Sequence, residues 1–217
     1  MRLGTISSFV AFTWIIVSAV SLLVGCGSPK TSDSVRAHPA PSQQLRLEIP
    51  QTSWVPIFFK EIDQLATIGN LPSLRTIVLP NDDLEARLWV AGGNFGMDGI
   101  VVRKTSGSWS GTYLHGFSKE PNFKKYAEPL QAPRSGWDTT WQRLAEAGLL
   151  TMPDASQVQC NVNGKDGVGF VFETNVNGTY RTYFYDNPAF AECDEAKQLL
   201  NIISIIDREF GLQWPTN

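Results

Sequence analysis

Alternation of apolar and polar residues predicts short strands in two groups along the chain. The predicted strands cover residues 45–49, 84–91, 100–105, 109–115, 158–162, 168–176 and 179–185. Asn163-Gly164 and Asn177-Gly178 supply the positive φ angles that tight hairpins require, and Ser106-Gly107 turns the chain in the first group. Short connections between neighbouring strands predict antiparallel meanders.

Three segments have the 3.6-residue apolar period of a helix instead. They cover residues 56–65, 135–150 and 194–210. Runs of antiparallel strands with interposed helices predict an α+β fold, in which antiparallel β meanders of about six to seven strands carry two to three helices packed on the sheet. Strand 84–91 places aliphatic residues on one side and Glu85, Arg87 and Trp89 on the other, which predicts a half-buried strand.

The first 26 residues indicate the compartment. Arg2 precedes a mostly apolar run over residues 9–24, which is shorter than the roughly 20 residues of a membrane span. The run ends in Leu23-Val24-Gly25-Cys26, which resembles the lipobox of bacterial lipoproteins. The resemblance implies cleavage before Cys26 and attachment of fatty-acyl chains such as palmitate to it. The alternative is an uncleaved anchor helix that extends back to Ile6.

These signals divide the chain into three parts. We expect a signal peptide over residues 1–25, the lipidated Cys26 with a flexible linker up to residue 44, and one α+β domain over residues 45–217. By the sorting rule of bacterial lipoproteins, Gly27 after the lipidated residue implies the outer membrane in a host with two membranes. In other hosts it implies the outer face of the cytoplasmic membrane.

The remaining cysteines, Cys160 and Cys193, form an even pair once Cys26 carries lipid. In an oxidising compartment such a pair predicts an intramolecular disulfide. A metal pair or a catalytic thiol are the competing interpretations. A metal site would need further Cys or His ligands, and His115 is the only histidine outside the linker.

Composition and motifs exclude several function classes. The net charge of -3, from 18 Lys+Arg and 21 Asp+Glu, is the wrong sign for binding nucleic acid. Gly107 to Gly111 has Trp109 where a nucleophile elbow needs Ser, and Gly93, Gly96 and Gly99 precede a predicted strand where a phosphate loop needs a helix. The sequence therefore predicts no metal site, no cofactor and no catalytic residues.

One group of residues offers a candidate binding surface. If the first meander pairs in register, six Arg and aromatic side chains could share the face opposite the aliphatic one: Arg87, Trp89, Arg103, Trp109, Tyr113 and His115. Such a face can bind an anionic group through Arg and stack an apolar ring. The alternative is that these side chains only cover a water-facing side of the sheet.

Four stretches carry a further resemblance: RLWVAGG, GSWSGTYLHG, GWDTTWQRLAEAGLLTMPD and NGTYRTYFYDNP. They resemble bacterial lipoproteins of no known activity, so no site transfers. The sequence predicts a membrane-anchored, non-enzymatic module that binds a protein, peptide or glycan of the cell envelope. One alternative is an envelope-polymer hydrolase that uses His115 with a carboxylate, and another is a purely structural tether.

Overall fold

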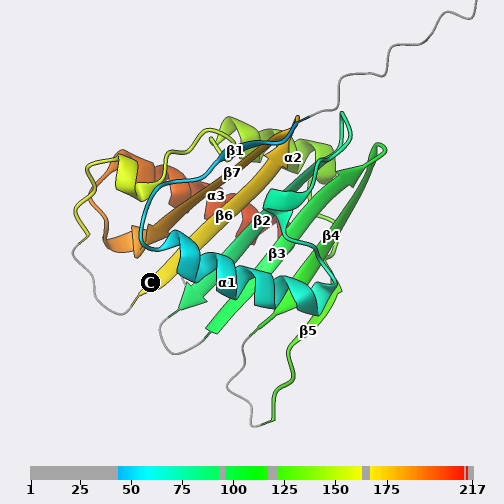
Figure 1. Ribbon diagram of the computed structural model, residues 1–217, viewed down its shortest axis with the longest axis horizontal. Coiled ribbons are helices and arrows are strands. Elements are labelled where there is room, and N and C mark those ends of the chain that lie inside the picture. The colour runs from blue at the N-terminus through cyan, green and yellow to red at the C-terminus, as the bar shows by residue number, and fades with distance from the viewer. Residues whose placement is uncertain (1–43, 93–95, 117–121, 163–166, 213, 215–217) are drawn as a thin grey trace, which may run out of the picture. The chain divides into compact units, whose positions relative to one another are not determined.

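A seven-stranded sheet with helices on both faces organises the domain (Figure 1). The computed structural model describes residues 44–92, 96–116, 122–162, 167–212 and 214. The strands are β1 (Arg46–Glu48), β2 (Leu84–Gly92), β3 (Gly96–Thr105), β4 (Ser108–His115), β5 (Tyr126–Pro129), β6 (Val168–Val176) and β7 (Thr179–Asp186). Their order in the sheet is β1-β7-β6-β2-β3-β4-β5. The pairing is antiparallel except between β1 and β7, so the expected α+β fold is confirmed.

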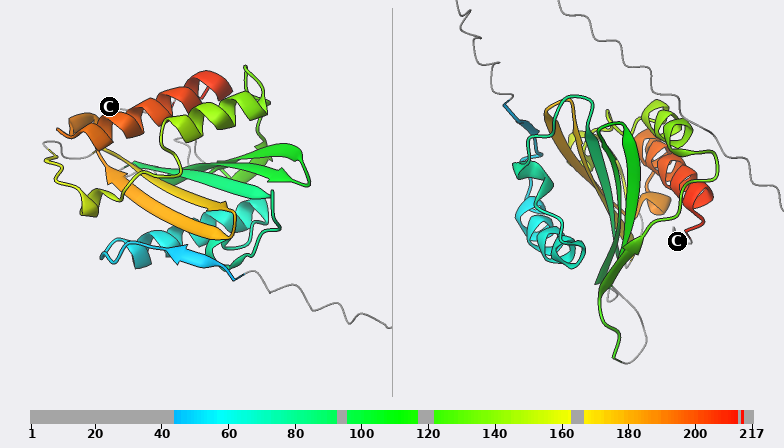
Figure 2. Two further views of the ribbon diagram at one scale, coloured as in Figure 1. Left: turned by 90° about the horizontal axis from the view of Figure 1, so that it is seen from above. Right: turned by 90° about the vertical axis from the view of Figure 1, so that its right-hand side faces the viewer.

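The three α-helices cover both faces of the sheet, as Figure 2 shows. Helix α1 (Val55–Ala66) lies against one face, hereafter the α1 face. Helices α2 (Trp137–Glu146) and α3 (Asp194–Phe210) lie against the other, the α2/α3 face. Short 3-10 turns cover Thr67–Gly69, Leu74–Thr76, Ala155–Gln157 and Pro188–Phe190. The central strands are therefore covered on both sides.

The larger core lies on the α2/α3 face. Aliphatic and aromatic residues of the four central strands point there, among them Leu88, Ile100 and Phe172. Helix α3 buries Leu199, Ile202, Ile203 and Ile206 against them, which accounts for its broad apolar stripe. Gly211, with a φ of 70°, ends α3 in the left-handed conformation that glycine adopts easily.

A second core lies on the α1 face. Ile62, Leu65 and Ala66 of α1 pack against Trp89 and Val101. Strand β2 is consequently buried on both sides, and the prediction of a half-buried strand is wrong. The reason is that two segments from earlier in the chain cover the side that carries the polar residues: α1 packs on Trp89, and the segment at 72–77 contacts Arg87.

The hairpin turns follow the sequence signals. Asn177 and Gly178 have φ angles of 51° and 70°, and Ser106 and Gly107 have 49° and 81°. Positive φ at both central residues is the conformation that matches the twist of a two-residue hairpin. The predicted turn at Asn163-Gly164 lies outside the described residues.

Four elements differ from the prediction. Strand β3 begins at Gly96, because the glycine-rich segment continues the pairing with β2 down to Gly92. Strand β5 was not predicted, and residues 158–162 contribute only an isolated bridge from Val162 to Ala191. Helix α2 is shorter than residues 135–150, because Gly136 with a φ of 82° precedes it and Gly148 with a φ of 98° follows it.

The predicted disulfide between Cys160 and Cys193 is confirmed. Their Cα atoms lie 5.2 Å apart, and 33 positions separate them in the chain. Cys193 is the residue that precedes α3, so the bridge ties the segment after α2 to the start of the last helix.

The chain divides into two units, residues 1–40 and 41–217, and the described residues all belong to the second. Within those residues, none of the helices has the length and apolar character needed to cross a membrane.

Candidate functional site

The six residues predicted to share one face lie on both faces of the sheet. Arg87, Trp89 and Arg103 belong to the α1 face, whereas Trp109, Tyr113 and His115 belong to the α2/α3 face. The Ser106-Gly107 turn sets which face each side chain of β4 occupies. It pairs Thr105 with Ser108 and so places Trp109 opposite Lys104, on the face opposite to Arg103. The expectation of one shared surface is wrong, since side chains alternate between faces along a strand.

Arg87 is fixed inside the domain by a buried carboxylate. Its Nε donates to Glu85 Oε1 at 2.6 Å and its Nη2 donates to the Pro72 carbonyl at 2.9 Å. Arg103 Nε donates to the second Glu85 oxygen, also at 2.6 Å. Arg87 is 1% exposed, so it cannot reach a ligand in solution. The group Glu85, Arg87 and Arg103 joins the strands β2 and β3.

Trp89 belongs to a second buried group around Glu173. Its Nε1 donates to Glu173 Oε2 at 2.7 Å, and the Tyr180 hydroxyl donates to Oε1 at 2.7 Å. Burial raises the pKa of Glu173, and the positive charge of Arg87 on the neighbouring strand opposes that shift. Both oxygens are satisfied by protein donors, so this carboxyl is a structural group of the core.

Trp109 packs between the sheet and α2. Its ring stacks on Trp137 at 6.0 Å between centroids and lies 5.8 Å from Trp141. Its Nε1 donates to Asp138 at 2.8 Å, and that hydrogen bond, followed by one from Lys104, lowers the pKa of Asp138. The contacts of Trp109 are those of a residue that docks a helix.

His115 has the carboxylate partner that the hydrolase alternative requires. Its Nε2 lies 2.7 Å from Glu128 Oε1, and its ring stands 4.1 Å from Tyr113 and 4.2 Å from Tyr126. Burial raises the pKa of Tyr113 to about 12, so this hydroxyl stays protonated at neutral pH. Glu128 is 52% exposed on the edge strand β5, which leaves the pair open to water.

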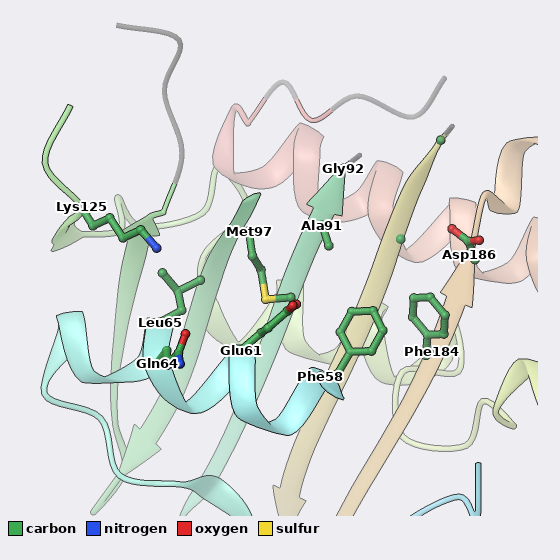
Figure 3. A pocket seen from close by; sticks show the side chains of 12 residues that line it. Phe58, Glu61, Gln64, Leu65, Ala91, Gly92, Met97, Lys125, Phe184 and Asp186 are labelled. Atoms are coloured by element: carbon green, nitrogen blue, oxygen red, sulfur yellow. The ribbon is translucent and has the colours of Figure 1, made fainter. Parts of the chain in front are cut away.

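A cleft of about 430 Å³ opens between α1 and one end of the sheet (Figure 3). Its floor and walls are apolar or small residues: Phe58, Leu65, Ala91, Gly92, Met97, Gly167, Gly169 and Phe184. Its polar lining consists of Glu61, Gln64, Lys125 and Asp186. Polar and apolar surface contribute in similar amounts to this lining, so the cleft is a mixed concave site whose polar groups can orient a ligand.

The cleft is hollow because small residues and large rings alternate around it. Gly169 has no side chain to fill the floor beneath α1. At one end, Phe184 packs against Phe58 at 4.7 Å and against Trp54 at 5.3 Å, and these rings hold α1 away from the sheet. A Cβ on Gly169 would lie 2.8 Å from the Phe184 ring, so a side chain there would displace that ring.

Sequence reasoning did not identify this cleft. Its residues come from α1, β2, β3, β6 and β7 and from the segments before β5 and β6, and no local motif joins them. The one usable signal was the density of glycine at 92–99, which the sequence analysis interpreted as a connection between strands. In the part of the chain that the structure describes, no group of three or more His, Cys, Asp or Glu side chains could hold a metal ion.

Comparison with known proteins does not assign a role to the cleft. The chain matches no protein-family model, and a search of curated proteins finds no match in sequence.

Proposed function

We propose that the protein is a membrane-anchored bacterial lipoprotein whose folded domain binds a component of the cell envelope in the cleft between α1 and the sheet. The observation that carries the proposal is the cleft itself, with an apolar floor, an aromatic end and four polar lining residues. Its volume of about 430 Å³ lies within the range of roughly 300–1,000 Å³ that ligand pockets occupy. The ligand classes that fit are a protein segment, a peptide or a glycan.

Two features support the compartment. The sequence Leu23-Val24-Gly25-Cys26 resembles a lipobox, and the linker that follows is long enough to separate the domain from lipid headgroups. The Cys160–Cys193 disulfide is typical of proteins that function outside the reducing cytosol. Gly27 after Cys26 favours the outer membrane in a host with two membranes.

Site-specific photo-crosslinking tests the binding proposal. A photoreactive residue at Gln64, which lines the cleft, should form discrete adducts in intact envelopes. The same residue at the exposed Gln142 of α2 is the control and should form none. Ala91→Phe should fill the floor and remove the adducts while the melting temperature stays near that of the wild type. Adducts of equal yield at both positions would refute binding in the cleft.

The pair of His115 and Glu128 favours a second function, an envelope-polymer hydrolase. A carboxylate at 2.7 Å can orient an imidazole as a general base. The two residues lie on β4 and on the edge strand β5, and neither lines the cleft. Release of soluble fragments from purified envelope polymer, lost in His115→Asn and retained in the cleft-filling variant, would establish this activity.

A further inference from the structure

The two ends of the cleft differ in chemistry. Phe58, Phe184 and Asp186 lie at one end, and Lys125 lies at the other (Figure 3). We propose that the cleft binds an extended peptide and that a basic side chain, lysine or arginine, occupies the aromatic and acidic end. The inference rests on the proposed binding function and specifies the ligand.

The aromatic end suits a cation on an aliphatic stem. The rings of Phe58 and Phe184 lie 4.7 Å apart with their planes inclined by 40°, and the Trp54 ring contacts both. Gly169 allows the Phe184 ring to lie across β6, which holds the ring in place. Aromatic faces attract ammonium and guanidinium groups, and the methylene stem of either side chain packs on the same rings.

Each ring has a carboxylate beside it. Glu61 follows Phe58 by three positions on α1, and Asp186 follows Phe184 by two positions on β7, so each acid shares a face with its ring. Among the described residues, no hydrogen bond or ion pair engages the side chain of Glu61 or Asp186. By contrast, Asp63 of the same helix is occupied by Arg75 at 2.6 Å. The two acids are therefore available to a ligand.

The length of the cleft indicates an extended ligand. Its floor runs from Phe184 on β7 to Met97 on β3, which is three strand spacings or roughly 14 Å. Four residues of extended peptide span about the same distance, roughly 13–14 Å. Lys125 lies beyond β3, so it does not neutralise the acidic end, and it favours a carboxylate farther along the same peptide.

A pair of matched peptides tests the assignment. Two alanine pentapeptides, each with a neutral fluorescent label and an amidated C-terminus, carry lysine or norleucine at the centre. Norleucine keeps the aliphatic stem and lacks the ammonium group. The measurement is fluorescence anisotropy with the full chain in lipid nanodiscs, at low and high salt.

We expect the lysine peptide to bind roughly fivefold more tightly than the norleucine peptide, because a cation–π contact and an exposed ion pair add together. Asp186→Asn should lower this ratio by about two- to fivefold. The matched control is Asp82→Asn, which removes the same charge at the opposite end of β2 from an exposed position whose φ of 70° suits asparagine. High salt should lower the ratio as Asp186→Asn does.

The outcomes separate the two proposals. Equal affinity for both peptides, with cleft adducts still formed at Gln64, would overturn the basic side chain and leave the binding function standing. Absence of both peptide binding and adducts would overturn both. Peptide binding that appears only after deletion of residues 27–40 would assign the cleft to the chain's own linker and overturn the external peptide. Asp186→Asn and Asp82→Asn should melt at the same temperature, since both acids are exposed.

Discussion

Replacement of Arg87 by methionine should strongly destabilise the domain although the residue lies on a strand face that resembles a polar surface. Methionine keeps most of the side-chain volume and removes the charge. The change leaves Glu85, which is 1% exposed, with one of its two cationic partners. Breaking a buried ion pair costs about 3–5 kcal/mol.

The structure places the expected cost at the low end of that range. Arg103 Nε remains 2.6 Å from Glu85 Oε2, and Arg87 Nη1 has no hydrogen-bond partner to lose. We therefore expect a loss of about 3 kcal/mol, which lowers the melting temperature of a domain of this size by about 6–12 °C. Near-ultraviolet circular dichroism of the full chain during heating measures this change.

Two further variants test whether the buried ion pair causes the destabilisation. Arg103→Met is the matched control, because its side chain is 36% exposed and its loss should cost less than the loss of the buried Arg87. The double variant Glu85→Leu and Arg87→Met should melt above Arg87→Met alone, because no buried carboxylate that has lost a cationic partner remains in the core. A melting temperature of Arg87→Met equal to that of Arg103→Met would show that the buried pair contributes little.

Three other predictions concern separate parts of the chain. Replacing Cys160 and Cys193 by serine should cost roughly 3–4 kcal/mol, read by chemical unfolding, and two freely alkylated thiols in the unreduced wild type would contradict the bridge. Cys26→Ser should abolish incorporation of labelled palmitate and leave uncleaved precursor, whereas unchanged labelling would refute lipidation. Burial raises the pKa of Asp207 to about 6, so the folded state favours the neutral acid. The stabilisation that the protonated Asp207 carboxyl contributes is present below about pH 4 and is lost as the pH rises through about 6. Asp207→Asn should therefore raise the free energy of unfolding by about 1 kcal/mol at about pH 8 and change it little at about pH 4. Equal shifts of the melting temperature at both pH values would contradict this prediction.

The elements with strong local signals were predictable. Helix α3 has the predicted bounds, residues 194–210, because its apolar stripe is continuous and Gly211 ends it. The two hairpins at 106–107 and 177–178 follow from their turn residues. Strand β5 escaped prediction because its four residues show no apolar alternation and pair with β4 at the edge of the sheet.

The burial of Arg87 and the cleft could not be predicted in the same way. Glu85 and Arg87 alternate with aliphatic residues as they would on a water-facing strand, and their burial depends on the cover provided by the segment at 72–77 and by α1. The cleft depends on the contact between Phe58 of α1 and Phe184 of β7, which are distant in the chain. Such contacts result from packing of the whole domain, which residue periodicity does not encode.

The parallel pairing of β1 with β7 has a mechanical consequence. Strand β1 has three residues, is the first described element of the chain, and lies at an edge of the sheet. A pull on the chain that precedes β1 therefore loads the short β1–β7 ladder first. Once β1 separates from β7, the next element under load is α1, which forms one wall of the cleft. Force applied through the segment before β1 would thus open the cleft before it disturbs the core.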